Sequence, residues 1–221
     1  LGSQMFSFFK RFLRDADLLD NKGFSRTARI IERCGLDDLS AWGIMLANLA
    51  YTPQIGWFIK NFEFRENVSR NYAISRLMDD GTQERAANDI WRSYSRFIDL
   101  PFSEIGLGVP DKDNGKTVSF TRISWLNPEP KVILYALYKF SEACGNYKQF
   151  SLTRLLNHEI ESDGISPTQI FGLDRTTMER ILNGLSNNYP DFISVSFTLD
   201  LDNINLKDKT SDDVLSLFEG V

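Results

Sequence analysis

Guanidinium and amide side chains recur on one side of the stretch from Thr82 to Ile98, where they belong to Arg85, Asn88, Arg92 and Arg96. Because a helix has 3.6 residues per turn, this spacing brings all four to one face. Such groups bind phosphate oxygens and read base edges when a helix enters the major groove of DNA. The pattern therefore predicts a nucleic-acid contact. The alternative is a solvated helix face on which the arginines pair with Glu84 and Asp89.

A second basic group follows in a predicted β-hairpin. Residues 111–116 read Asp-Lys-Asp-Asn-Gly-Lys, and Asn-Gly is typical of a two-residue hairpin turn. Lys112, Lys116 and Arg122 are expected to contact the DNA backbone beside the helix. A calcium loop is excluded, because Gly115 comes one position early and Arg122 stands where a bidentate Glu is needed.

No catalytic residue, metal site or cofactor is predicted for this chain alone. His158 is the sole histidine and is followed by Glu159, with no second histidine or cysteine at the spacing of zinc ligands. The sequence also lacks a Gly-rich phosphate loop, a nucleophile elbow and a Cys/His nucleophile arrangement. We expect a chain that is not an enzyme by itself.

The net charge of −5 hides a difference between the two halves of the chain. Residues 1–127 carry 17 basic and 16 acidic side chains, whereas residues 128–221 carry 8 and 14. So little positive charge does not attract DNA over the whole surface, which argues against a strong non-specific DNA binder. Any nucleic-acid contact must therefore come from a local patch in the first half.

Composition favours a folded cytoplasmic protein without membrane spans. Hydrophobic residues make up 42% of the chain, which is enough for a packed core. The longest apolar run, Val132–Tyr138, is far shorter than the roughly 20 residues that a span needs. No secretory signal is visible. Cys34 and Cys144 are expected to be small buried residues in a reducing cytoplasm.

One order of elements occurs twice, in Arg65–Ile123 and in Pro130–Leu206. Each copy has a helical stretch, a Gly-containing turn, an N-capped amphipathic helix and two strand-like runs around a turn. Helix–turn–helix followed by a hairpin is the winged-helix arrangement. We therefore predict a mainly α fold with small β-hairpins, in which tandem winged-helix-like units follow an N-terminal helical subdomain. The predicted domains are residues 5–63, 64–127 and 128–206, with a tail at 207–221.

Turn and cap residues set the expected boundaries of these elements. Ser25 is expected to cap a helix that ends at Cys34, and Thr82 to cap the arginine-bearing helix. Val68 is assigned to the helix before it. In the second copy the expected caps are Ser166 and Asp174, and Thr198–Asp200 is the expected hairpin turn. The tail, with Val214, Leu215, Leu217 and Phe218, is predicted to be either a docking helix or a loose end.

Aromatic motifs carry a resemblance to a known family. They are Trp42, Asn48-Leu49-Ala50-Tyr51-Thr52-Pro53, Trp57, Ile90-Trp91-Arg92-Ser93 and Leu107-Gly108 with the closing hairpin. Over about residues 8–206 the chain resembles an uncharacterised bacterial helical family found beside, or fused behind, large phosphoadenosine-phosphosulfate (PAPS) reductase-like proteins. Those proteins are often encoded near DNA-modification and phage-defence systems. The resemblance implies an accessory role in DNA association or complex formation, as a part of, or a partner to, a PAPS reductase-family enzyme. The Ser-Gly-Gly-x-Asp-Ser loop of the reductase-like proteins is absent from this chain.

These observations favour a DNA-binding or DNA-positioning accessory module, with DNA and a protein of the modification or defence system as partners. The alternative is a protein-interaction scaffold without DNA contact, which would use the acidic second copy and the Phe218 tail. The second copy is expected to bind protein or support its neighbour, because its helix carries few basic groups on the corresponding face. A weaker possibility is regulatory ligand binding around Trp42 and Trp57.

Overall fold

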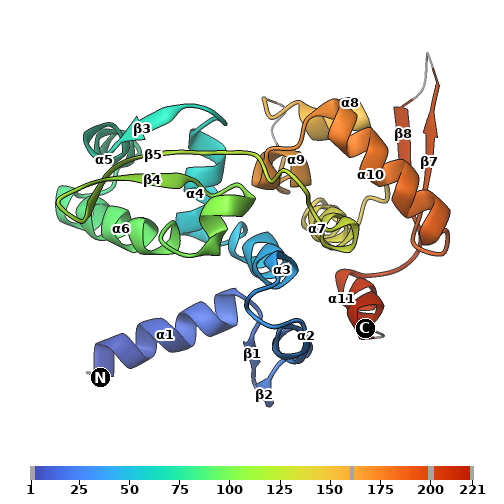
Figure 1. Cartoon of the computed structure of the whole chain (residues 1–221), viewed down its shortest axis with the longest axis horizontal. Helices are drawn as coiled ribbons and strands as arrows, with labels where there is room; N and C mark the ends of the chain where they lie inside the picture. Colours follow the sequence, from blue (N-terminus) through green and yellow to red (C-terminus); the bar gives the residue numbers. More distant parts are fainter. Residues whose placement is uncertain (1–2, 160–161, 199–201, 220–221) are drawn as a thin grey trace.

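Three groups of elements surround a buried helix, α3 (Leu39–Leu49), which contacts α2, α7 and the 3-10 helix η1 (Figure 1). The computed structural model describes residues 3–159, 162–198 and 202–219. α3 is apolar on nearly all sides, and every residue from 43 to 49 is buried. A helix of this kind needs neighbours on all sides, so the other elements pack around it.

The N-terminal subdomain is built from helices and one short hairpin. Its elements are α1 (Ser3–Asp15), β1 (Leu19–Asp20), β2 (Gly23–Phe24) and α2 (Arg26–Cys34). The Ser25 cap is confirmed, because its Oγ accepts a hydrogen bond of 3.1 Å from the Ala28 N–H. α1 ends at Asp15, and Leu19 pairs with Phe24 in the hairpin.

The first unit combines three α-helices and one 3-10 helix with a three-stranded sheet. Its elements are α4 (Pro53–Asn61), β3 (Asn67–Ser69), α5 (Arg70–Asp79), α6 (Glu84–Phe97), η1 (Pro101–Ile105), β4 (Val109–Asp113) and β5 (Lys116–Thr121). The strand order is β3-β5-β4, and all pairs are antiparallel. The Asn-Gly hairpin is confirmed, with Asn114 at φ 48° and Gly115 at φ 75° in the turn.

The second unit repeats the order of the α-helices and strands, with a further short helix, α9, before α10 and no 3-10 helix at the described residues between α10 and β7. Its elements are α7 (Pro130–Ala143), β6 (Gln149–Ser151), α8 (Leu152–Leu156), α9 (Pro167–Phe171), α10 (Arg175–Asn188), β7 (Ile193–Phe197) and β8 (Asp202–Leu206). The strand order β6-β8-β7 matches that of the first unit. Ser166 and Asp174 cap α9 and α10 as expected. Part of the predicted turn at Thr198–Asp200 lies outside the described residues.

A shared detail defines where each repeat begins. β3 and β6 both place a buried side chain, Val68 or Phe150, against the central strand. Both end in a serine, Ser69 or Ser151, whose hydroxyl caps the following helix. The assignment of Val68 to a helix was therefore wrong. A helix precedes this strand in both units, so α4 is the counterpart of α7 and the first repeat begins before Arg65.

The expected Thr82 cap is also wrong, because the preceding helix uses that residue. Gly81, at φ 87°, follows the last turn of α5, and its N–H donates to the Met78 carbonyl. The Thr82 N–H donates to the Leu77 carbonyl, which completes a Schellman motif. α6 therefore begins at Glu84, and its N-cap residue Gln83 makes no capping side-chain hydrogen bond.

The tail folds back onto the molecule. α11 (Ser211–Leu215) and the 3-10 helix η2 (Ser216–Phe218) lie beside α7 and α2, and Val214, Leu215 and Phe218 are buried. Arg26 of α2 holds this segment through Asp212 at 2.9 Å and Glu219 at 2.8 Å. The Phe218 tail is thus a docked helix, and its buried side chains cannot form a free partner surface. The mainly α fold with small β-hairpins is confirmed, while the winged-helix assignment stays a prediction.

Candidate nucleic-acid interface

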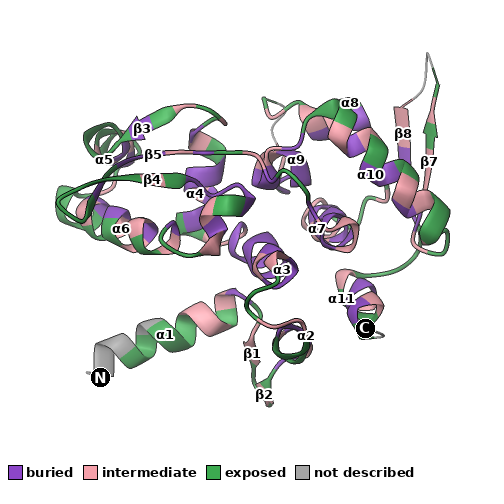
Figure 2. Ribbon diagram, viewed as in Figure 1, coloured by how far each residue is buried: buried purple, intermediate pink, exposed green. Residues whose placement is uncertain are grey.

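α6 has a buried face and an exposed face (Figure 2). Trp91 and Tyr94 are buried, and the Tyr94 ring stacks on Phe58 with 3.6 Å between ring centroids. The Tyr94 hydroxyl donates to the Leu107 carbonyl at 2.5 Å, and burial raises the pKa of this phenol above its ordinary value. These contacts fix the rotation of the helix, so the opposite side faces solvent.

Arg85, Arg92 and Arg96 are all exposed on that opposite side. Arg92 pairs with Asp89 at 3.0 Å, but the two side chains are 72% and 61% exposed, so the pair contributes little and is open to exchange. Within the part of the chain that the structure describes, Arg85 and Arg96 have no carboxylate within 4 Å. Two of the three guanidinium groups are therefore available to an anion.

Asn88 is committed to contacts within the protein. Its Nδ2 donates to the Glu84 carbonyl at 2.9 Å, and its Oδ1 accepts from Arg70 Nη2 at 2.5 Å. The amide therefore holds Arg70 of α5 next to α6. Sequence reasoning missed Arg70, although a signal was present. It occupies the first position of α5, where a positive charge opposes the helix dipole and needs another explanation.

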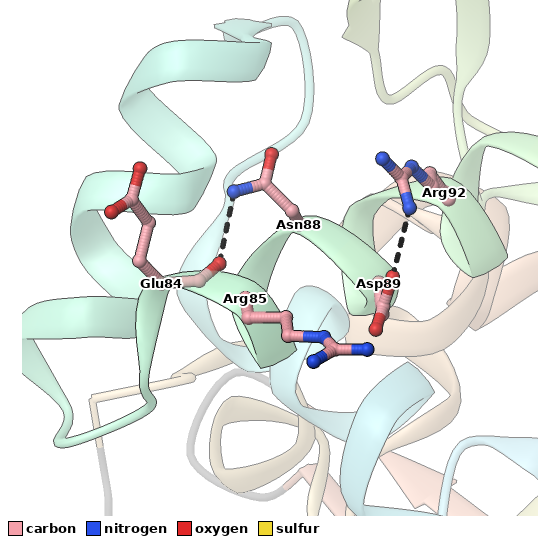
Figure 3. Close-up of a pocket in the computed structure, with 5 residues that line it drawn as sticks. All are labelled: Glu84, Arg85, Asn88, Asp89 and Arg92. Atoms are coloured by element: carbon pink, nitrogen blue, oxygen red, sulfur yellow. Dashed lines mark hydrogen bonds and ion pairs between the residues drawn. The ribbon is translucent and has the colours of Figure 1, made fainter.

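A surface hollow of about 400 Å³ lies on this face of α6 (Figure 3). Its lining is mixed in charge and consists of Glu84, Arg85, Asn88, Asp89 and Arg92. Residues 64–127, which contain α5, α6 and the three strands of the first unit, carry nine basic and nine acidic side chains. The positive character of the surface is therefore confined to the arginine stripe and does not extend over the unit.

The hairpin places its two lysines differently. Lys112 Nζ lies 2.7 Å from Asp99 Oδ1, with both side chains about two-fifths exposed. Lys116 is exposed, and no carboxylate within the described residues lies within 4 Å of it. A register shift between Asp111 and Lys112 bends β4 at this point. Lys116 is thus the freer of the two lysines.

Arg122 is not part of the surface, which corrects its predicted role. Its side chain is 1% exposed and donates to five backbone carbonyls, those of Ile59, Phe62, Gly106, Gln169 and Ile170. Its guanidinium carbon lies 4.0 Å from the centroid of the Phe64 ring. Burial lowers the pKa of Arg122 to about 10, so the group remains charged at neutral pH. A side chain buried in this way cannot reach DNA.

Residues 52–220 match the profile of a family described as a protein of unknown function, DUF4007. The chain belongs to the DUF4007 family. No curated protein matches its sequence.

Two crystal structures share the fold of this DUF4007 chain. One is described as magnesium ion-bound SspB, with a TM-score of 0.67, 13% identity, and coverage of 100% of this chain and 76% of SspB. The other, described as SspB, has a TM-score of 0.68, 14% identity, and coverage of 99% and 75%. At this identity the likeness shows the fold alone. The expected association with PAPS reductase-like proteins stays a prediction.

The histidine and the two cysteines of the DUF4007 chain do not form a metal site among the described residues. Within residues 3–159, 162–198 and 202–219, no three His, Cys, Asp or Glu side chains are grouped to hold a metal ion. His158 is half-buried, with Nε2 3.1 Å from Thr168 Oγ1, and burial lowers the pKa of its imidazole. Cys34 and Cys144 are free thiols and are half-buried, not fully buried as expected. No helix among the described residues has the length and apolar character to cross a bilayer.

Proposed function

We propose that this protein is a non-catalytic accessory module that contacts DNA through the exposed face of α6. In this proposal the two units are winged-helix-like, and the first unit presents α6 to the major groove. The observation that carries the proposal is the stripe of Arg85, Arg92 and Arg96, which is solvent-exposed while the aromatic side of the same helix is locked into the core.

Two further side chains extend the proposed contact. Arg70 reaches the α6 face through its hydrogen bond to Asn88. Lys116 lies in the hairpin, where a wing would meet the phosphate backbone. Guanidinium and ammonium groups at these places suit phosphate contacts, which set register and orientation on a duplex. Arg122 has no part in this contact because it is buried.

The second unit supports the first in this proposal and does not itself read DNA. The outer face of α10 carries Thr176, Arg180, Asn183 and Asn187, all exposed, with one basic group among them. Arg175 is already paired with Glu179 at 3.3 Å. With 8 basic and 14 acidic side chains in residues 128–221, this half would repel a polyanion.

Fluorescence anisotropy with a labelled duplex at two salt concentrations tests the proposal. The variant R85A/R92A/R96A is expected to lose most of its affinity for the duplex. The slope of log affinity against log salt concentration is also expected to become shallower, by the equivalent of about three phosphate contacts. A matched variant, R29A/R33A/R180A, removes the same charge from three exposed arginines elsewhere and is expected to keep its affinity. An equal loss of affinity in both variants would show that net charge, and not the α6 face, determines binding. No binding by the unaltered protein at low salt would refute DNA contact.

A protein-interaction scaffold is the second candidate function, and the mixed charge of the α6 hollow favours it. Glu84 and Asp89 lie among the arginines. These two carboxylates would repel the phosphates of DNA, whereas a protein surface with complementary charges could pair with both the carboxylates and the arginines. Under this alternative, charge reversal at Asp89 would weaken the binding of the protein partner. Under DNA contact, Asp89→Asn would strengthen duplex binding by removing a repulsive charge next to Arg92.

The proposed module acts beside a larger enzyme. The resemblance to a family found with PAPS reductase-like proteins supports that role, and so does the fold shared with SspB. Co-purification with the product of a neighbouring reductase-like gene tests it. If the two proteins do not co-purify but the duplex still binds, the role beside a larger enzyme is refuted and the DNA contact is retained.

A further inference from the structure

Two phenylalanine rings of α1 are open to solvent. Phe6 is 61% exposed and Phe9 is 57% exposed, although phenylalanine is among the residues most often found fully buried. Phe6, Phe9 and Phe12 follow one another at intervals of three residues, so they form a row along one side of the helix. The row is packed on the protein at Phe12 and open at the other two rings.

α1 is fixed to the rest of the protein at its C-terminal end. The Phe12 ring lies against Phe97 of α6, with 5.7 Å between ring centroids, and Ala16, just after the helix, is fully buried. Phe97 directly follows Arg96, the last arginine of the exposed α6 stripe. In Figure 1 the N-terminal half of α1 projects away from the other elements. The open rings therefore lie on an arm that starts at the end of the proposed duplex contact.

Cations flank the two open rings. Lys10 lies one turn after Phe6 and Arg14 one turn after Lys10, so a basic row runs beside the aromatic row. Lys10 and Arg14 are exposed, and within the described residues neither has a carboxylate within 4 Å. The side chain of Arg11 is 69% exposed and pairs with Asp15 at 3.5 Å. The arm thus combines exposed aromatic rings with positive charge.

Exposed aromatic rings beside cations are the groups with which proteins bind single-stranded nucleic acids. The cations hold the phosphate backbone, and unpaired bases stack on the rings. The bases of a duplex already stack on one another, so the open rings of α1 suit unpaired nucleotides better. A protein groove or a lipid surface could also receive apolar rings. The contact between Phe12 and Phe97, which links the arm to the α6 stripe, favours nucleic acid.

We propose that α1 binds single-stranded DNA that extends from the duplex held by α6. In this arrangement Phe6 and Phe9 stack on unpaired bases, and Lys10 and Arg14 contact the phosphates between them. The preferred substrate is then a duplex with a single-stranded extension. The position of the duplex rests on the proposed function, whereas the contact of α1 with a single strand can be measured by itself.

Fluorescence anisotropy of the full chain with three labelled DNAs tests this inference. They are a blunt duplex, the same duplex with a thymidylate extension of about ten nucleotides at its 5′ or 3′ end, and the extension alone. The extended duplex is expected to bind about tenfold or more tighter than the blunt duplex, because stacking on the two rings is added.

The variant F6A/F9A is expected to remove most of this gain and to leave blunt-duplex binding unchanged. F6L/F9L keeps an apolar side chain at both positions but removes the aromatic faces, so it is expected to lose the gain as well. K10A/R14A is expected to weaken binding of the extension and to make its salt dependence shallower, by the equivalent of about two phosphate contacts. Phe24→Ala, at another exposed ring, is the matched control and is expected to keep the gain.

The contacts of α1 and α6 fail in different ways. R85A/R92A/R96A is expected to weaken both duplexes and to leave the single strand unchanged. If the single strand binds through the two rings while the blunt duplex does not bind, the α6 contact is refuted and the α1 contact is supported.

The α1 contact is overturned if the extension adds no affinity, or if F6A/F9A or F6L/F9L keeps the gain. Co-sedimentation with phosphatidylglycerol vesicles, without any gain from the extension, would assign the arm to a lipid surface instead. Because Phe6 and Phe9 are largely exposed, their removal is expected to leave the fold intact, and circular dichroism checks this.

Discussion

At the scale of single residues, identical side chains have opposite roles, and their positions in the fold decide which. Arg85 and Arg122 are both arginines in the first unit, yet one is exposed and the other is 1% exposed. Helical spacing was sufficient to predict the exposure of Arg85. Nothing local marks Arg122, because its carbonyl partners come from α4, from Gly106 and from α9, up to 63 residues away in sequence.

Arg122→Met is expected to destabilise the fold by roughly 3–5 kcal/mol, because several buried carbonyls lose their donor. Arg85→Met makes the same chemical change on the surface and is expected to stay within about 0.5 kcal/mol. Urea denaturation of both variants measures the difference. Equal stability of the two would show that the Arg122 hydrogen bonds contribute nothing net.

At the scale of elements, local chemistry predicts the ends of helices and turns when one signal acts alone. Ser25, Ser166 and Asp174 cap helices as expected, and Asn114-Gly115 forms the expected turn. Prediction fails at Thr82, where two signals compete, since the Schellman motif at the end of α5 uses its N–H. It fails at Val68 because a three-residue strand is defined by its partner β5, which lies about 50 residues later.

Substitution of two glycines distinguishes the effect of backbone strain from the effect of steric crowding. An added Cβ at Gly115 or at Gly184 would meet nothing within 4 Å, but only Gly115 has positive φ. Gly115→Ala is expected to destabilise the protein by about 1 kcal/mol through left-handed strain. Gly184→Ala, inside α10, is expected to stabilise it by about 0.5–1 kcal/mol. Thermal denaturation compares them, and a shift of the same sign for both would contradict the argument.

At the scale of the whole molecule, the tail joins parts of the chain that are far apart in sequence. α11 contacts both α2 and α7, so the tail brings the N-terminal subdomain and the second unit together. Sequence alone left a docking helix and a loose end as alternatives. The choice depends on whether α2 and α7 form a surface that can receive Val214, Leu215 and Phe218, and that is a property of the assembled fold.

This placement predicts that the tail contributes to stability and is not available to a partner. Phe218 is 3% exposed, and Lys131 Nζ lies 4.8 Å from the centroid of its ring. Phe218→Ala is expected to cost about 3–5 kcal/mol of unfolding free energy. Arg26→Ala, which removes only partly exposed ion pairs to the same segment, is expected to cost about 1 kcal/mol or less.

Urea denaturation of the two variants, with Phe24→Ala as a control at an exposed aromatic residue, measures these differences. The order of the two losses carries the argument. Burial of the ring predicts that Phe218→Ala has the larger effect, whereas a tail held mainly by charge predicts that Arg26→Ala does. A tail that detaches to bind another protein predicts that neither variant changes stability, and that result would return Phe218 to the role of a partner contact.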